Sequence, residues 1–152
     1  MEPLSTRERI VIAANRLFYR EGIRAVSVDA VAAEAGLTKR SLYYHFDSKD
    51  DLVAAYLAYR DQPNLAGFQR SYEAADGSVA DKIAGIFNTL AESAAHPKWT
   101  GCGFLRTSAE LANLPGHPAI VLGAAHKKRI EAWLAECLAA DGIVDAGTLA
   151  RQ

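Results

Sequence analysis

The stretch Gly36-Leu-Thr-Lys-Arg-Ser-Leu-Tyr-Tyr-His-Phe46 decides how this chain of 152 residues folds. It opens with a glycine, which often ends a helix, and has a threonine two residues later, which often starts one. If Lys39 to His45 form a short helix, Leu42 and Phe46 share one face at a spacing of four residues. The two cations and the two tyrosines then lie on the outer face. The pattern predicts a short helix with a basic and aromatic surface.

Two more helices are predicted before this stretch. Ser5 and Glu8 have the spacing of a capping box, and the segment from Arg9 to Glu21 contains no helix breaker. Its apolar residues recur at helical spacing, and Gly22 is placed to end the helix. Ser27 is the cap of a second, short helix that ends at the glycine of the quoted stretch. A long helix followed by two short ones around a turn is a helix-turn-helix arrangement.

The remaining chain is predicted to be helical as well, so the fold class is all-α. Ser48 and Asp51 start a long fourth helix, which Pro63 and Gly67 are expected to bend or end near Gln62, with a continuation to Glu73. Three further helices are predicted over residues 78–95, 104–112 and 119–140.

Composition excludes several classes of protein. The net charge of −1 excludes a uniformly basic nucleic-acid binder but leaves room for a local basic patch. Residues 1–46 carry 7 lysines and arginines against 5 acids, whereas residues 47–152 carry 10 against 13. The longest apolar run, Leu52 to Tyr59, is far shorter than the roughly 20 residues of a membrane span. With no secretory signal and two cysteines, we expect a cytoplasmic protein without membrane contact.

The basic outer face of the short helix has the chemistry needed for DNA. A helix fits the major groove, about 12 Å wide, where Lys39 and Arg40 can reach guanine edges. Thr38, Tyr44 and Lys49 are suitable partners for phosphate oxygens. Two alternatives remain open from the residues alone. The charges can form an ordinary solvated face, and the chain can be a helical adaptor that contacts other proteins without reading DNA.

Residues 7–55 closely resemble the DNA-binding domain of the TetR family. The resemblance is carried by three stretches: Arg9-Ile-Val-Ile-Ala-Ala-Asn-Arg-Leu-Phe-Tyr-Arg-Glu-Gly22, Ser27-Val-Asp-Ala-Val-Ala-Ala-Glu-Ala-Gly36 and Leu37-Thr-Lys-Arg-Ser-Leu-Tyr-Tyr-His-Phe-Asp-Ser-Lys-Asp-Asp-Leu52. It implies a DNA-binding domain over residues 1–47 and a helical ligand-binding and dimerisation domain over residues 48–152. It also implies a homodimeric repressor, less often an activator, that binds a near-palindromic operator on double-stranded DNA and is released by a small-molecule inducer.

The resemblance assigns DNA contacts by position. Base reading falls to Lys39, Arg40 and Tyr43, with Ser41 and Tyr44 beside them. Phosphate contacts fall to Ser27, Thr38, Tyr44, His45 and Lys49. Val28 and Asp29 occupy positions that sometimes touch DNA in the family, but an apolar residue and an acid suit that role poorly.

The resemblance also places an inducer pocket in the second domain, where aromatic side chains gather. Candidate walls are Phe68, Tyr72, Phe87, Trp99, Phe104 and Trp133, and candidate polar contacts are Asn88, Arg106, Thr107 and His126. Each aromatic residue taken singly also suits an ordinary core position. The segment Gly101-Cys-Gly-Phe-Leu-Arg-Thr-Ser-Ala-Glu-Leu111 is similar to a motif of a small-molecule-responsive branch of the family.

Other chemistry has little support in the sequence. His96, Cys102, His117, His126 and Cys137 lack the close spacing of a preformed metal site. The chain has no phosphate-binding loop, nucleophile elbow or paired carboxylates, so we expect no enzyme and no cofactor.

The length raises a question about the dimer. Family members usually carry two more C-terminal helices, which form the dimer interface. We expect these helices to be missing, with residues 145–152 as the start of the first. In that case the dimer would have to use the helices predicted over residues 104–112 and 119–140.

Overall fold

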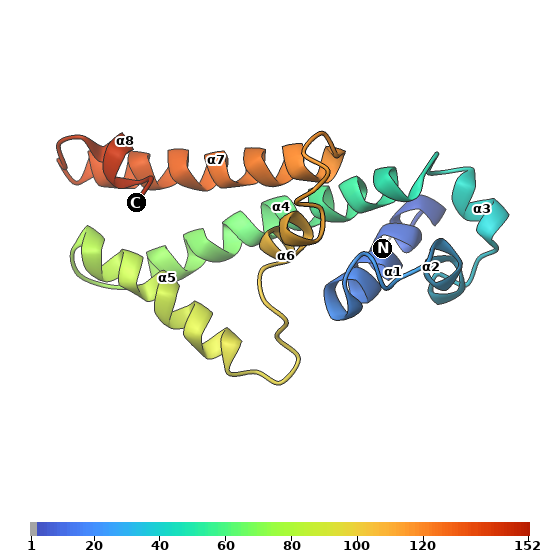
Figure 1. Cartoon of the computed structure of the whole chain (residues 1–152). Helices are drawn as coiled ribbons and strands as arrows, with labels where there is room; N and C mark the ends of the chain where they lie inside the picture. Colours follow the sequence, from blue (N-terminus) through green and yellow to red (C-terminus); the bar gives the residue numbers. More distant parts are fainter. Residues whose placement is uncertain (1–2) are drawn as a thin grey trace. The chain divides into compact units, whose positions relative to one another are not determined.

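The chain is all-helical in the computed structural model, which describes residues 3–152, and no strand occurs in that range. Figure 1 shows the helices coloured along the chain. Their bounds are α1 Thr6–Glu21, α2 Val28–Glu34, α3 Lys39–Tyr43, α4 Lys49–Ala74, α5 Val79–Ala94, α6 Gly103–Glu110, α7 Pro118–Ala140 and α8 Ala146–Leu149. The predicted fold class is confirmed.

Capping residues determine where the N-terminal helices begin. At α1, the Ser5 side chain accepts a hydrogen bond from the backbone N–H of Glu8, and the Glu8 carboxylate accepts one from the backbone N–H of Ser5. Ser27 and Thr38 cap α2 and α3 in the same way, each accepting from the N–H three residues on. Ser78 and its partner in α5 repeat the box of α1. These caps satisfy N–H groups that the first turn of a helix leaves without a carbonyl partner. The predicted helix starts at these residues are confirmed.

The fourth helix does not end near Gln62, so that part of the prediction is wrong, and the bend expected there stays a prediction. Helix α4 runs without interruption from Lys49 to Ala74 with Pro63 inside it. A proline removes one backbone hydrogen bond and disfavours the helix, but it does not prevent one. Four apolar side chains of α4 before the proline are buried, and tertiary packing of this kind outweighs local propensity. The continuation beyond the proline was predicted to Glu73 and reaches Ala74.

Packing divides the chain into two units. The first unit is the chain as far as Arg60 together with Thr100–Gly123, and the second is Asp61–Trp99 together with Ala124–Gln152. The first unit includes the start of α4 because Leu52 and Tyr56 are buried in its core. The domain boundary predicted after residue 47 follows the sequence motif instead, and it stays a prediction.

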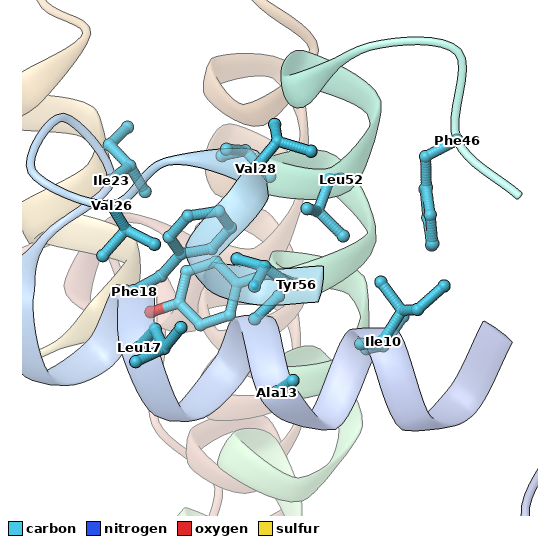
Figure 2. Close-up of a cluster of buried hydrophobic side chains, with 14 of the residues drawn as sticks. Ile10, Ala13, Leu17, Phe18, Ile23, Val26, Val28, Phe46, Leu52 and Tyr56 are labelled. Atoms are coloured by element: carbon cyan, nitrogen blue, oxygen red, sulfur yellow. The ribbon is translucent and has the colours of Figure 1, made fainter. Parts of the chain in front are cut away.

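The core of the first unit holds the three N-terminal helices together. Figure 2 shows Ile10, Leu17 and Phe18 of α1 with Leu52 and Tyr56 of α4 in this cluster. The Phe18 and Tyr56 rings meet edge to face with their centroids 5.5 Å apart. Each fully buried side chain of this size contributes about 1.5–3 kcal/mol. The core therefore provides a rigid support for the short helices α2 and α3.

Helix α6 binds the C-terminal end of α1 within the first unit. The Glu110 carboxylate accepts hydrogen bonds from the backbone N–H groups of Ile23 at 3.3 Å and Arg24 at 2.9 Å. Arg106 donates to the carbonyl oxygen of Tyr19 at 2.6 Å, and the Thr100 hydroxyl donates to the same oxygen at 2.8 Å. Backbone groups at the end of α1 thus find partners on a segment about ninety residues away.

An aromatic contact and a polar network are among the interactions that join helices of the second unit. Tyr72 of α4 and Trp133 of α7 meet edge to face with ring centroids 5.6 Å apart. The buried His126 side chain lies between Asp61 and Asn64, to which its ring nitrogens are hydrogen-bonded at 2.6 and 2.8 Å. Both bonds therefore tie α7 to α4. Within residues 3–152, none of the helices is both long enough and apolar enough to cross a membrane.

Candidate nucleic-acid interface

The candidate site is the helix α3 with the turn that precedes it. Gly36 adopts a positive φ of 68°, which a residue with a side chain rarely adopts, and so it permits the turn between α2 and α3. Leu42 and Phe46 are almost completely buried, at 0% and 4% exposure, and they fix the inner face of this segment. The helix ends at Tyr43 rather than at the predicted His45, because Tyr44 forms its C-cap.

The outer face of α3 and its C-cap residue present four long side chains to solvent. Lys39, Arg40, Tyr43 and Tyr44 are all exposed, with Tyr44 the most exposed of the tyrosines at 75%. Arg40 donates a long hydrogen bond of 3.4 Å to the Tyr44 hydroxyl, one helical turn away. An exposed guanidinium supplies the forked donors that recognise guanine in the major groove.

Lys39 does not extend freely into solvent. Its ammonium group donates a hydrogen bond of 2.9 Å to the Asp29 carboxylate on α2. This hydrogen bond, together with the attraction between the two charges, raises the pKa of Lys39 above its ordinary value. The pair holds the lysine against α2, and a base or phosphate has to compete with Asp29 for it.

The candidate phosphate contacts have different surroundings. The oxygens of Ser27 and Thr38 accept the capping bonds of α2 and α3, and a hydroxyl that accepts can still donate its proton. The Thr38 oxygen also lies 2.9 Å from that of Ser41, which is half-buried, so these two hydroxyls share one hydrogen bond. His45 is exposed. Partial burial lowers the pKa of Lys49, while Glu110 and Asp50 act in the opposite direction.

The predicted DNA contacts thus form a short, nearly continuous set. Seven of the nine lie between Thr38 and His45, and the other two, Ser27 and Lys49, stand at the starts of α2 and α4. The DNA-contact assignment stays a prediction.

One supporting residue was missed in the sequence. The Arg9 guanidinium of α1 donates a hydrogen bond of 2.7 Å to the carbonyl oxygen of Ala35, directly before the glycine of the turn. The two residues are 26 positions apart, so no local pattern could have linked them. This hydrogen bond attaches the turn before α3 to α1.

The predicted pocket residues fall into both units. In the first unit, Phe104 and Thr107 are buried, and Arg106 binds the end of α1. In the second unit, Phe68 lines a cavity of about 190 Å³ between α4 and α5. The others there are Tyr72 and Trp133, which contact each other, His126, which is buried, and Phe87, Asn88 and Trp99, which are exposed. The pocket assignment stays a prediction.

In the part of the chain that the structure describes, no cluster of metal-ligating side chains supports metal binding. Among the side chains of residues 3–152, no three histidines, cysteines, aspartates or glutamates gather closely enough to hold an ion. Cys102 and Cys137 are free thiols, both half-buried.

Comparison with known proteins shows that the chain is similar to bacterial transcriptional regulators. Residues 10–56 match the family described as "Bacterial regulatory proteins, tetR family". Two curated relatives from Pseudomonas putida are 33% identical over 88 residues, which is 54% of this chain: the uncharacterized HTH-type transcriptional regulator TtgW and the HTH-type transcriptional regulator SrpR. The aligned part covers 66% of TtgW and 41% of SrpR, so this chain matches less than two thirds of either relative.

The likeness to solved structures extends over nearly the whole chain. The crystal structure of a TetR-family transcriptional regulator from Streptomyces coelicolor superposes with a TM-score of 0.81 at 32% identity, covering 96% of this chain and 76% of that one. A TetR regulator from Legionella pneumophila, at 24% identity, shares the fold with a TM-score of 0.78 and covers 100% of this chain and 82% of its own.

Proposed function

The chain belongs to the TetR family of DNA-binding transcriptional regulators, and we propose that it acts as a repressor which a small molecule releases from its operator. The observation that carries the proposal is the division of α3 into two faces. Leu42 and the adjoining Phe46 are buried in the core, while Lys39, Arg40 and Tyr43 are exposed on the other side. A helix so supported can enter the major groove without losing its own packing.

In this proposal, one set of residues binds phosphate groups and positions α3, and another set recognises the bases. The hydroxyls of Ser27 and Thr38 donate to phosphate oxygens and set the depth and register of α3. Arg40 makes paired hydrogen bonds to a guanine edge and therefore discriminates between base pairs. Tyr43 packs its ring against bases beside that contact. The alternative class, an adaptor without DNA readout, does not require this combination of exposed groups.

The dimer and the inducer complete the proposal. Two copies present their α3 helices to successive major grooves of a near-palindromic operator. A small molecule binds in the helices beyond the DNA reader and favours a state that cannot span both half-sites. Since the proposed partner is bacterial double-stranded DNA, we propose the cytoplasm as the site of action.

The test begins with operator selection. Sequences bound by the full chain are selected from random double-stranded DNA, and affinity is then measured over a range of salt concentrations. We expect affinity to fall linearly on a log–log plot as salt rises, because phosphate contacts release counterions. An adaptor would show no salt-dependent binding to any sequence.

Two substitutions then distinguish a base contact from a phosphate contact. Arg40→Ala should weaken operator binding by about 1–3 kcal/mol and relax the preference at one base pair. Lys49→Ala should weaken all sequences alike and reduce the salt slope by about 1. Arg70→Ala, which removes an exposed arginine of α4 in the second unit, is the matched control and should leave both measurements unchanged. Unchanged operator affinity in both of the first two variants would show that α3 is not the reading helix.

A further inference from the structure

Two arginines of α1 contact the segments on either side of α3. The Arg9 guanidinium donates a hydrogen bond of 2.7 Å to the carbonyl oxygen of Ala35, before the turn into α3. The Arg7 guanidinium lies over the ring of Phe46, which follows α3, at 4.9 Å from its centroid. We propose that Arg9 is a positioning residue for DNA reading, which holds α2 and α3 in the mutual orientation that specific binding requires. This inference rests on the proposed reading role of α3 and adds a residue outside the predicted DNA contacts.

The end of α2 leaves one carbonyl oxygen for Arg9. The backbone N–H groups of Gly36 and Leu37 donate to carbonyl oxygens of α2 at 3.0 and 2.9 Å, in the pattern of a Schellman motif. Among the described residues, no backbone N–H donates to the carbonyl oxygen of Ala35, which is only 8% exposed. Arg9 supplies the missing donor, and its positive charge is also favourable beside the C-terminal end of a helix.

The guanidinium of Arg9 packs directly on the turn. A Cβ atom added at Gly36 would lie 3.4 Å from Nη2 of Arg9, which is van der Waals contact. In the part of the chain that the structure describes, no carboxylate lies within ion-pair distance of Arg9, so no acid draws the guanidinium away from the carbonyl oxygen. Since Thr38 caps α3 directly after this turn, a displacement of the turn also displaces the start of α3. The contact therefore constrains where the reading helix begins.

Arg7 contacts the chain at the other end of α3. Side chains two positions apart on a helix point in different directions, so Arg7 and Arg9 reach different segments. Phe46 is 4% exposed and belongs to the core, so the cation–π contact joins the start of α1 to a fixed point after α3. A helix of five residues is too short to stay ordered through its own hydrogen bonds. The orientation of α3 therefore depends on contacts such as these on either side of it.

The test compares specific with non-specific binding of the full chain. Each variant is titrated against an operator selected from random double-stranded DNA and against an unrelated duplex of the same length, over a series of salt concentrations. Arg9→Met retains a long side chain but removes the charge and the donors. We expect affinity for the operator to fall about five- to tenfold, because a hydrogen bond from a charged donor contributes substantially and water replaces part of it. Affinity for the unrelated duplex and its salt slope should stay unchanged.

A second arginine of α1 provides a matched control. Arg16 also contacts α2, through an exposed ion pair of 3.5 Å with Glu34, but it does not touch the turn. Exposed pairs contribute little, so Arg16→Met should retain operator affinity within about twofold. Arg7→Met should lose about two- to fivefold, which is the contribution of an exposed cation–π contact. Titrations are made where circular dichroism shows every variant to be folded, so that a loss of stability alone leaves affinity unchanged.

The outcomes distinguish this inference from the proposed function. Equal operator affinity in Arg9→Met and the parent chain would overturn the inference and leave the function standing. An equal loss on both duplexes, with a salt slope reduced by about 1, would also overturn it, because Arg9 would then be a phosphate contact. Selection of no operator by the parent chain would contradict the proposed function itself, and with it the reading role of α3 on which the inference rests.

Discussion

At the scale of single residues, the ion pair formed by Lys39 and Asp29 is expected to weaken the proposed binding of α3 to DNA. The two groups are 2.9 Å apart and both are exposed, so the pair itself adds little to folding stability. We expect its effect on the proposed DNA binding to be larger. Asp29 places a negative charge beside the proposed phosphate contacts and engages a cation that DNA would otherwise use.

Replacing Asp29 with asparagine should therefore strengthen binding. The isosteric variant Asp29→Asn removes the competing charge, and we expect affinity for non-specific DNA to rise a few-fold, with a salt slope steeper by up to about 1. Filter binding or fluorescence anisotropy across a salt series measures both quantities. Glu34→Gln is the control, since Glu34 is an exposed acid of the same helix whose partner is Arg16. A slope that changes equally in both variants would show that Asp29 has no special relation to the reading helix.

Residue-scale features could be predicted from the sequence only where they are local. The two faces of α3 follow from a spacing of four residues, so Leu42 and Phe46 were correctly predicted to point inward. The partner of Lys39 lies 10 residues away and the partner of Arg9 lies 26 away, on different helices. Such contacts depend on how the helices pack, which no local pattern records.

At the scale of helices, two capping boxes make stability depend on pH. The carboxylates of Glu8 and Asp81 accept hydrogen bonds from Ser5 and Ser78, and these bonds lower the pKa of each acid below its ordinary value of 4.5 or 3.8. A lowered pKa in the folded state means that the stabilisation is present above the ordinary pKa. It is lost as the pH falls through the folded-state pKa.

The double variant Ser5→Ala/Ser78→Ala should test this dependence. At pH 6 it should unfold at a lower urea concentration than the parent chain, because both caps are lost. At pH 3 the difference should shrink, since protonation weakens the same hydrogen bonds in the parent. Ser93→Ala, which removes a hydroxyl bonded only to its own helix, is the control and should show no such narrowing. A difference that stays constant with pH would contradict the assignment.

The hydrogen bonds between α6 and the residues that follow α1 are a second feature at the scale of helices. Glu110→Ala leaves the N–H groups of Ile23 and Arg24 without their carboxylate, and Ile23 is 4% exposed. An unsatisfied buried donor costs about 1–3 kcal/mol, so the free energy of unfolding in urea should fall by that amount. Glu92→Ala, an exposed position on α5, serves as control and should change stability little. Equal losses in the two variants would mean that this contact does not stabilise the fold.

The helices themselves could be predicted better than their lengths. Caps such as Ser27 and Thr38 act over three residues and are visible in the sequence. The uninterrupted course of α4 through Pro63 was not visible, because it depends on burial of side chains such as Leu52 and Leu57 against other helices. The Glu110 contact spans 87 residues and was equally hidden.

At the scale of the molecule, the buried side chains are unevenly divided between the two units. The largest fully buried side chains all belong to the first unit, among them Tyr56, Ile10 and Leu42. The second unit has few buried side chains and carries an exposed Phe87. This difference in packing suits the proposed ligand-released regulator, because segments that respond to ligands come from the less stable parts of a protein.

The proposed dimer makes a prediction about operator length. Two α3 helices that enter successive major grooves must be about 34–36 Å apart, which corresponds to half-sites one helical turn of 10–10.5 base pairs apart. Inserting five base pairs at the operator centre turns one half-site to about the opposite side of the duplex. We expect two chains per unmodified operator by native mass spectrometry, and an affinity reduced to that for a single half-site after the insertion. Changing the central base pairs without altering the length is the control and should have a much smaller effect. One bound chain per operator, or an affinity that the insertion leaves unchanged, would show that each copy reads DNA alone.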